Sequence, residues 1–177
     1  MMHDTSNIRD TAKMALLLAV NCISAYIIIP LPFSMSPLSI QTMVINLLAF
    51  LLAPKQVALV MGGYLLMGLA GLPVFTGGTA GPGKLFGPTG GYIICFALAA
   101  VLISILRGKH NGFKICALLG VFVGIPVIYA GGALQLKLLT GMDWQQAFVT
   151  GVLPFIPMDV VKVVAAAYLT QSIKKVI

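Results

Sequence analysis

Hydrophobic residues fall into six long runs, separated by short segments rich in proline, glycine or charged residues. The runs cover about 12–29, 38–53, 56–73, 85–106, 113–138 and 147–172. Most approach the ~20 residues that a helix needs to cross a bilayer, so the pattern predicts six transmembrane helices. The second run is short and carries Gln41, Thr42 and Asn46, and we therefore expect it to face protein rather than lipid.

The segments between the runs contain residues that end or begin helices. Pro30, Pro32 and Pro37 lie between the first and second runs, where proline disfavours continuation of a helix. Pro54 follows the second run and suits the first turn of the next helix. A glycine-rich segment at about 72–92 separates the third and fourth runs. The chain is expected to form one all-α integral membrane domain over residues 1–177.

The composition excludes an ordinary soluble protein. Of the 177 residues, 59% are hydrophobic and 8% are charged, whereas soluble domains carry about 25% charged residues. Disorder is also excluded, because disordered chains are poor in apolar residues. Cys22, Cys95 and Cys116 lie within apolar runs, and their spacing is not that of metal ligands or of a disulfide framework. We expect no bound metal.

The positions of the basic residues predict how the helices are oriented. If the N-terminus is cytoplasmic, eight basic residues lie on the cytoplasmic side and two, Lys84 and Lys137, on the outer side. The eight are Arg9, Lys13, Lys55, Arg107, Lys109, Lys114, Lys174 and Lys175. This excess follows the positive-inside rule, so both termini are expected in the cytoplasm. The formal charge of +7 then reflects topology and does not indicate nucleic-acid binding.

The glycine-rich segment is more than a flexible linker. Eleven of the 19 glycines lie between Gly62 and Gly91, and the segment also contains Phe75, Phe86 and Tyr92. A flexible spacer would instead be polar and rich in serine. Free backbone amides beside aromatic rings suit a loop on the outer face that contacts a ligand. The alternative is a tight turn whose glycines only allow close packing of helices.

A phosphate-binding motif is nearly present in the same segment. Residues 78–85 follow G-x-x-x-x-G-K-L, whereas the phosphate-binding loop needs Ser or Thr where Leu85 stands. Pro82 has no amide hydrogen to offer a phosphate, and the flanking segments are predicted helices rather than a strand and a helix. ATP binding at this segment is therefore not expected.

The last hydrophobic run contains a charged pair. Asp159 and Lys162 are three residues apart and so share one face of a helix. Lys162 precedes Lys174 by about 18 Å of helix, which places both charges in the outer half of the membrane. Ionisable residues at that depth usually face an internal cavity and mark a site. The pair suits a ligand carboxylate at the lysine and N–H donors at the aspartate, unless it only holds helices together.

One face of the first run carries small residues. Ala12, Ala15 and Ala19 lie three or four positions apart, which allows another helix to approach closely. This stripe suits either internal packing or the docking of a partner subunit.

Three segments together resemble one known family. They are residues 71–75, residues 85–92 with the motif G-P-T-G-G-Y, and residues 153–162, which contain Asp159 and Lys162. The combination resembles the BioY family, the biotin-specific substrate-binding (S) components of energy-coupling-factor (ECF) transporters. Residues 29–33 and Gln41-Thr42 fit the early part of the same family. The resemblance extends over nearly the whole chain.

The resemblance implies an S-component fold that binds biotin from outside in a bacterial cytoplasmic membrane. Partners would be a transmembrane coupling subunit and two cytoplasmic ATPases. It implies biotin contacts at Asp159 and Lys162 and docking through Ala12, Ala15 and Ala19. The glycine-rich loop and its flanks would also contact the ligand, at Phe75, Gly77, Gly78, Lys84, Phe86, Gly90, Gly91 and Tyr92.

Two functions from other classes remain as alternatives. A stand-alone carrier for a small carboxylated vitamin would couple transport to an ion gradient, with Asp159 as its titrating group, but no inverted repeat is evident. A membrane-embedded enzyme would need paired carboxylates, a nucleophile with its base, or a metal. The chain has only four acidic residues. We expect neither an enzyme nor a resident cofactor.

Overall fold

The computed structural model describes residues 2–32, 34, 36–110 and 112–175, with side chains described from residue 8 onward. The helices are α1 (Met2–Ser24), α2 (Gln41–Leu51), α3 (Pro54–Leu69), α4 (Pro82–Leu85), α5 (Gly90–Arg107), α6 (Phe113–Leu119), α7 (Ile125–Thr140), α8 (Trp144–Gly151) and α9 (Ile156–Lys174). A π-helical turn, η1 (Gly120–Gly124), joins α6 to α7. Strands β1 (Ile28–Ile29) and β2 (Leu38–Ser39) pair antiparallel, with Ile28 opposite Ser39.

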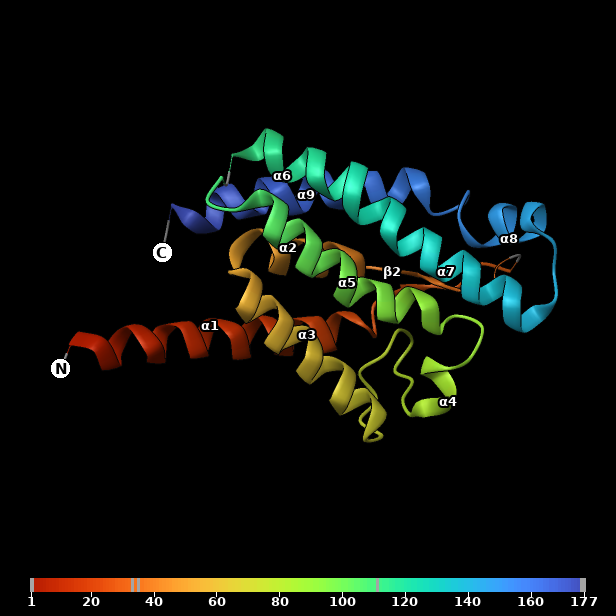
Figure 1. Ribbon diagram of the computed structural model, residues 1–177, viewed down its shortest axis with the longest axis horizontal. Helices are drawn as coiled ribbons and strands as arrows, with labels where there is room; N and C mark the ends of the chain where they lie inside the picture. Colours follow the sequence, from red (N-terminus) through yellow and green to blue (C-terminus); the bar gives the residue numbers. More distant parts are fainter. Residues whose placement is uncertain (1, 33, 35, 111, 176–177) are drawn as a thin grey trace.

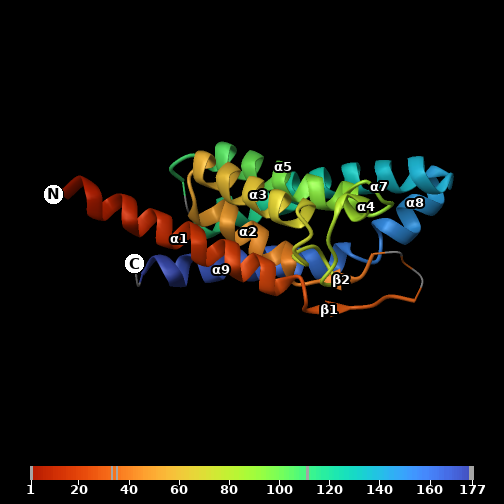
Figure 2. The same cartoon turned by 90° about the horizontal axis from the view of Figure 1, so that it is seen from below.

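The long helices form an elongated bundle with distinct ends. Both termini lie at one end, and the hairpin of β1 and β2, the loop after α3, α4 and α8 lie toward the other (Figures 1 and 2). Helix α2 lies inside the bundle and packs against α1, α5 and α9. These connecting segments therefore lie around the ends of α2, α5, α7 and α9 that are farthest from the termini.

Helix α2 is the most enclosed helix of the bundle, as its polar residues predict. Ile45, Leu48, Ala49 and Phe50 have at most 1% of their surface exposed. Pro54 opens α3, also as predicted, and the side chain of Gln56 accepts a hydrogen bond from the Ala53 amide at 3.0 Å. This bond satisfies one of the free amides at the start of the helix.

Three helical segments are long and apolar enough to cross a membrane within the described residues. They are Gly90–Arg107, the continuous helix Phe113–Thr140, and Ile156–Lys174. Large apolar side chains are exposed on the outside of the bundle, among them Leu59, Phe122 and Leu138. Apolar surface of this extent indicates contact with lipid or protein rather than water.

Several helix limits differ from the hydrophobic runs. The first helix ends at Ser24, because Pro30 and Pro32 follow and the isoleucines before them pair as β1. The run at 85–106 begins its helix only at Gly90, after the separate turn of α4. The run at 147–172 is two helices, α8 and α9, with a break at residues 152–155. Pro154 and Pro157 cannot donate the amide bonds of an unbroken helix there.

The π-helical turn lets three other helices approach the α6–α7 helix. A Cβ added at Gly120 would overlap Val163 of α9 and crowd Asn46 of α2, and one at Gly124 would crowd Ile103 of α5. Proline at position 126 opens α7, and a π turn absorbs the backbone disturbance that such a proline brings. The close packing of these helices therefore requires glycine at positions 120 and 124.

A buried arginine closes α2 at the end that carries the termini. Arg107, 4% exposed, donates hydrogen bonds to the carbonyl oxygens of Ala49 at 3.2 Å and Leu52 at 2.9 Å. The hydroxyl of Ser104 also donates to the Leu52 carbonyl, at 2.8 Å. These bonds satisfy carbonyl groups that the end of a helix leaves without partners.

Replacing Arg107 with methionine is expected to lower the free energy of unfolding by about 1–3 kcal/mol, because buried carbonyl groups lose their donors. The measurement is thermal unfolding of purified protein in one detergent. Arg9→Met is the matched control, since Arg9 is exposed on α1. Equal melting temperatures for the two variants would contradict a structural role for Arg107.

Candidate functional site

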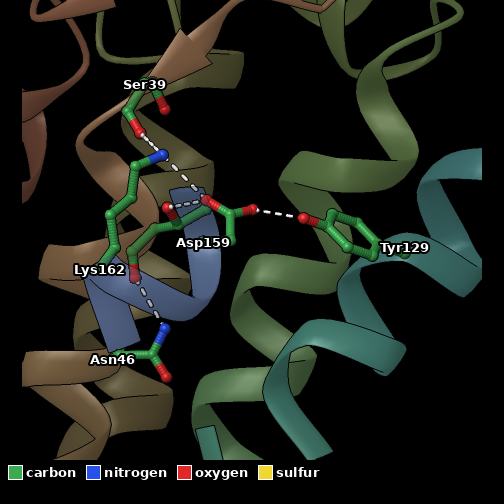
Figure 3. Close-up of polar contacts among 6 residues, drawn as sticks. Ser39, Asn46, Tyr129, Asp159 and Lys162 are labelled. Carbon is green, nitrogen blue, oxygen red and sulfur yellow. Dashed lines mark hydrogen bonds and ion pairs between the residues drawn. The ribbon is translucent and has the colours of Figure 1, made fainter. Parts of the chain in front are cut away.

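The charged pair of α9 forms the centre of a polar cluster. Asp159 is 6% exposed, and one of its oxygens, Oδ1, accepts a bond from Lys162 Nζ at 2.9 Å and from Thr42 Oγ1 at 3.0 Å. The other, Oδ2, accepts from the Tyr129 hydroxyl at 2.7 Å. Figure 3 shows Lys162 and Tyr129 on opposite sides of the carboxylate. Helices α2, α7 and α9 each supply one partner, so the carboxylate holds a fixed position.

Lys162 connects this cluster to the β-hairpin. Its Nζ atom also donates to the carbonyl oxygen of Ser39 in β2, at 2.7 Å (Figure 3). Two of the three hydrogen atoms of the ammonium group are thereby used, and one is left for another acceptor. Among the described residues, Lys162 and Asp159 form the only salt bridge. A buried pair of this kind is costly unless it is fully hydrogen bonded, and here it nearly is.

A cavity opens beside this cluster, at the end of the bundle away from the termini. The polar lining includes Ser39, Thr42, Thr76, Lys84, Thr89, Tyr129, Asp159 and Lys162, and the apolar lining includes Tyr92, Ile93, Phe96, Ile128 and Phe155. Its unfilled space is about 520 Å³ with the opening counted, of which about 40 Å³ admits the centre of a water molecule. The cavity is therefore narrow, and a larger ligand enters only if lining side chains move apart.

Lys84 brings a second cation to the cavity. It lies in the short helix α4 and is half-buried, and no hydrogen bond or ion pair joins its ammonium group to another described residue. Burial lowers the pKa of Lys84 below its ordinary value. With Asp159 and Lys162 balancing each other, the cavity carries one excess positive charge when Lys84 is protonated. Such a cavity favours a ligand with one negative charge.

Gly77 and Gly78 do not line the cavity; they form a turn that positions Thr76, which does. Phe75 and Thr79 pair through their backbones, and Gly77 and Gly78 form the turn between them with φ angles of 80° and 67°. This turn presents Thr76 to the cavity. Phe75 itself is fully buried against Tyr64, with ring centroids 5.5 Å apart.

The later residues of the loop divide between two roles. Tyr92 lines the cavity and donates its hydroxyl to the carbonyl of Gly151 at 2.7 Å. Phe86 is 67% exposed and borders a separate groove. Gly90 and Gly91 are buried packing positions, because a Cβ would overlap the carbonyl groups of Leu85 and Gly131, respectively. The structure thus brings Lys84 and Tyr92 to the cavity but leaves Phe86, Gly90 and Gly91 outside it.

Sequence reasoning missed three partners of the charged pair. Ser39, Thr42 and Tyr129 come from segments that are 30 or more residues away from Asp159. Thr42 had a signal, since it is polar within a short hydrophobic run. Tyr129 lies in an ordinary apolar helix and offered no comparable signal. Among the described residues, no group of three His, Cys, Asp or Glu side chains is arranged to hold a metal ion.

The alanine stripe of α1 lies on the surface. Ala12, Ala15 and Ala19 are all exposed, as are the neighbouring Leu16 and Ile23. The stripe therefore does not serve the internal packing of the described residues. An exposed apolar face with small residues along it allows close approach by another helix.

Known proteins with similar sequences and folds are biotin transporters. The model of the BioY family matches residues 1–177. The biotin transporter BioY of Thermotoga maritima is 35% identical over 167 residues, covering 94% of this chain and 96% of that protein. The biotin transporter BioY2 of Lactococcus lactis is 35% identical over 134 residues, covering 76% and 74%. The crystal structure of the S-component for biotin from an ECF-type ABC transporter superposes with a TM-score of 0.90 at 25% identity, covering 97% and 93%.

Proposed function

The chain belongs to the BioY family, and from this premise we propose that it binds biotin and carries it into the cell as the S component of an ECF transporter. The observation that carries the proposal is the agreement of sequence and fold over nearly the full length, including the biotin S component at a TM-score of 0.90. The protein is a membrane transporter subunit and not an enzyme. It resides in the cell membrane as a multi-pass protein.

The cavity around Asp159 suits the chemistry of biotin. Biotin has a ring urea with two N–H donors, an apolar sulfur-containing ring and a carboxylate on an aliphatic chain. Asp159 Oδ2 accepts one bond within the chain and can accept another from an N–H group of the ligand, and Phe96, Ile128 and Phe155 offer apolar walls for the rings. The excess positive charge is one, which the ligand carboxylate balances.

We place the carboxylate nearest Lys84. Lys162 is already neutralised by Asp159 at 2.9 Å, whereas the charge of Lys84 is not balanced by any described residue. An unbalanced cation in a desolvated cavity attracts an anion more strongly than a balanced pair does. Lys162 then holds Asp159 and the hairpin in position and offers its remaining hydrogen to the ligand.

Energy for transport comes from partner subunits in this proposal. An ECF-type transporter supplies a transmembrane coupling subunit and two cytoplasmic ATPases. The exposed face of α1 with Ala12, Ala15 and Ala19 is the proposed docking surface for the coupling subunit. A conformational change powered elsewhere reaches the cavity only through such a contact.

We propose six membrane segments with both termini in the cytoplasm. Three helices of the described part of the chain meet the length and hydropathy of a span, and α1, α2 and α3 would supply the others. Both termini lie at one end of the bundle (Figure 1), as an even number of spans requires. Labelling the variants Lys55→Cys and Gln145→Cys, each made after the three native cysteines are replaced with serine, with an impermeant reagent in intact cells tests the orientation. Only the Gln145→Cys variant should react.

The test of function is uptake of labelled biotin by cells that lack their own transporter. Expression together with a matching coupling subunit and ATPases is expected to raise uptake strongly above that of the chain alone. ATPases unable to hydrolyse ATP should remove this increase. Uptake that is equal without the partners, and that a protonophore abolishes, would instead establish the stand-alone carrier.

A further inference from the structure

A second groove lies at the end of the bundle that carries the termini. It is enclosed by α1, the end of α2 and the end of α9, and helix α2 packs against both of the others. Its unfilled space is about 850 Å³ with the opening counted. The side chains that define it are Lys13, Leu16, Leu17, Leu51, Ile173 and Lys174. It is thus an aliphatic groove with two ammonium groups.

Among the residues whose side chains the structure describes, none forms an ion pair with the two lysines of this groove. The Nζ atom of Lys174 is buried and has no hydrogen-bond partner among the described residues. A buried ammonium group without an acceptor is costly, so the groove is suited to an anion.

No acidic side chain that the structure describes supplies that anion. The chain has four acidic residues, of which Asp159 is paired with Lys162. Asp10 is exposed, accepts a bond from Gln56 at 3.1 Å, and forms no ion pair with Lys13. Asp143 caps the start of α8 through Gln146, and α8 lies at the opposite end of the molecule (Figure 1). The side chain of Asp4 lies outside the part of the chain whose side chains are described.

We infer that this groove binds an anionic phospholipid, with the phosphate between Lys13 and Lys174 and an acyl chain along Leu16, Leu17 and Ile173. Phosphate meets the two ammonium groups as a charge-assisted acceptor, and the aliphatic walls suit the acyl chain better than a free ion. The inference rests on the proposed orientation, which places the groove at the cytoplasmic leaflet, where anionic lipids and basic pockets between helices meet.

The groove is distinct from the proposed docking surface. At about 100° of rotation per residue, Lys13, Leu16 and Leu17 are centred about a third of a turn away from the alanine stripe of α1. A coupling subunit that covers the stripe therefore leaves the groove beside the contact. A lipid held there would lie at the edge of the interface.

The test compares two double variants that remove the same charge. Lys13→Gln with Lys174→Gln alters the groove, whereas Lys55→Gln with Lys175→Gln removes two exposed lysines. Purified protein in neutral detergent is titrated with phosphatidylglycerol or phosphatidylcholine and followed by native mass spectrometry and thermal unfolding. We expect phosphatidylglycerol to bind and stabilise the parent and control, with binding at least about tenfold weaker in the groove variant because two charge-assisted bonds are lost.

Three results would overturn the inference. Equal phosphatidylglycerol binding by both double variants would show general charge attraction. Equal stabilisation by glycerophosphate would show a site for free phosphate. The third result has two parts: the parent does not bind phosphatidylglycerol, and the groove variant fails to assemble with the coupling subunit. The groove would then belong to that partner. Biotin titration of each sample, at the opposite end of the molecule, controls for folding and tests the proposed function separately.

Discussion

Replacing Asp159 with asparagine is expected to weaken biotin binding by at least about 100-fold. The carboxylate accepts bonds from Lys162, Thr42 and Tyr129, and neutralising it leaves the ammonium group of Lys162 buried without its counter-charge. A hydrogen bond to a charged group contributes about 1.5–3 kcal/mol, and each 1.4 kcal/mol corresponds to about tenfold in affinity. The ligand loses such a bond, and the cavity loses the carboxylate that orders Lys162, Thr42 and Tyr129. Titration calorimetry with biotin measures the effect.

A matched control separates this effect from a general loss of charge. Asp10→Asn makes the same chemical change at an exposed residue of α1 and should leave the affinity unchanged. Tyr129→Phe removes one bond to the carboxylate and should give an intermediate loss, about 3–10-fold. Biotin affinity that survives Asp159→Asn in folded, monodisperse protein would show that the carboxylate does not contact the ligand or order the cavity.

Replacing Lys84 with methionine is expected to weaken binding of biotin by about 10–100-fold while leaving binding of the uncharged biotin carboxamide nearly unchanged. The substitution removes the one excess charge of the cavity and keeps a side chain of similar length. Only a ligand with a carboxylate loses its counter-charge. Competition binding with the two ligands on the same protein preparation measures both affinities.

Two other lysines provide the comparison for Lys84. Lys137→Met removes a charge near the same end of the molecule, where its ammonium group lies 4.3 Å from the ring centroid of Trp144, and should not distinguish the two ligands. Lys162→Ala should weaken the binding of biotin and of its carboxamide by the same factor, because it leaves the Asp159 carboxylate without its partner. If Lys162→Ala, and not Lys84→Met, discriminates between acid and amide, the ligand carboxylate lies at Lys162.

The parts of the site that sequence predicted are those fixed by local geometry. Asp159 and Lys162 meet because residues three apart share a helix face, and their ion pair is present. Pro54 opens α3 for the same kind of local reason. Pro157 stands in the first turn of α9, but the long run of apolar residues at 147–172 concealed the break before this helix.

The parts that sequence did not predict depend on how helices meet. Tyr129 reaches Asp159 across 30 residues of sequence, and no property of its apolar helix marks it. Phe75 is an aromatic residue in a glycine-rich loop, which suggested ligand contact, yet the turn at Gly77 directs Thr76 to the cavity and Phe75 into the core. Successive residues of an extended segment point to opposite sides, so only the tertiary structure decides which one faces the ligand.

The most direct test of the account is calorimetric titration of biotin into the purified chain alone in detergent, without ATP or partner subunits. We expect tight binding with one biotin per chain, because Asp159, Lys162, Lys84 and the apolar walls all come from this chain. No detectable heat from folded, monodisperse protein, together with no retention of labelled biotin, would contradict it. The cavity would then belong to a different ligand.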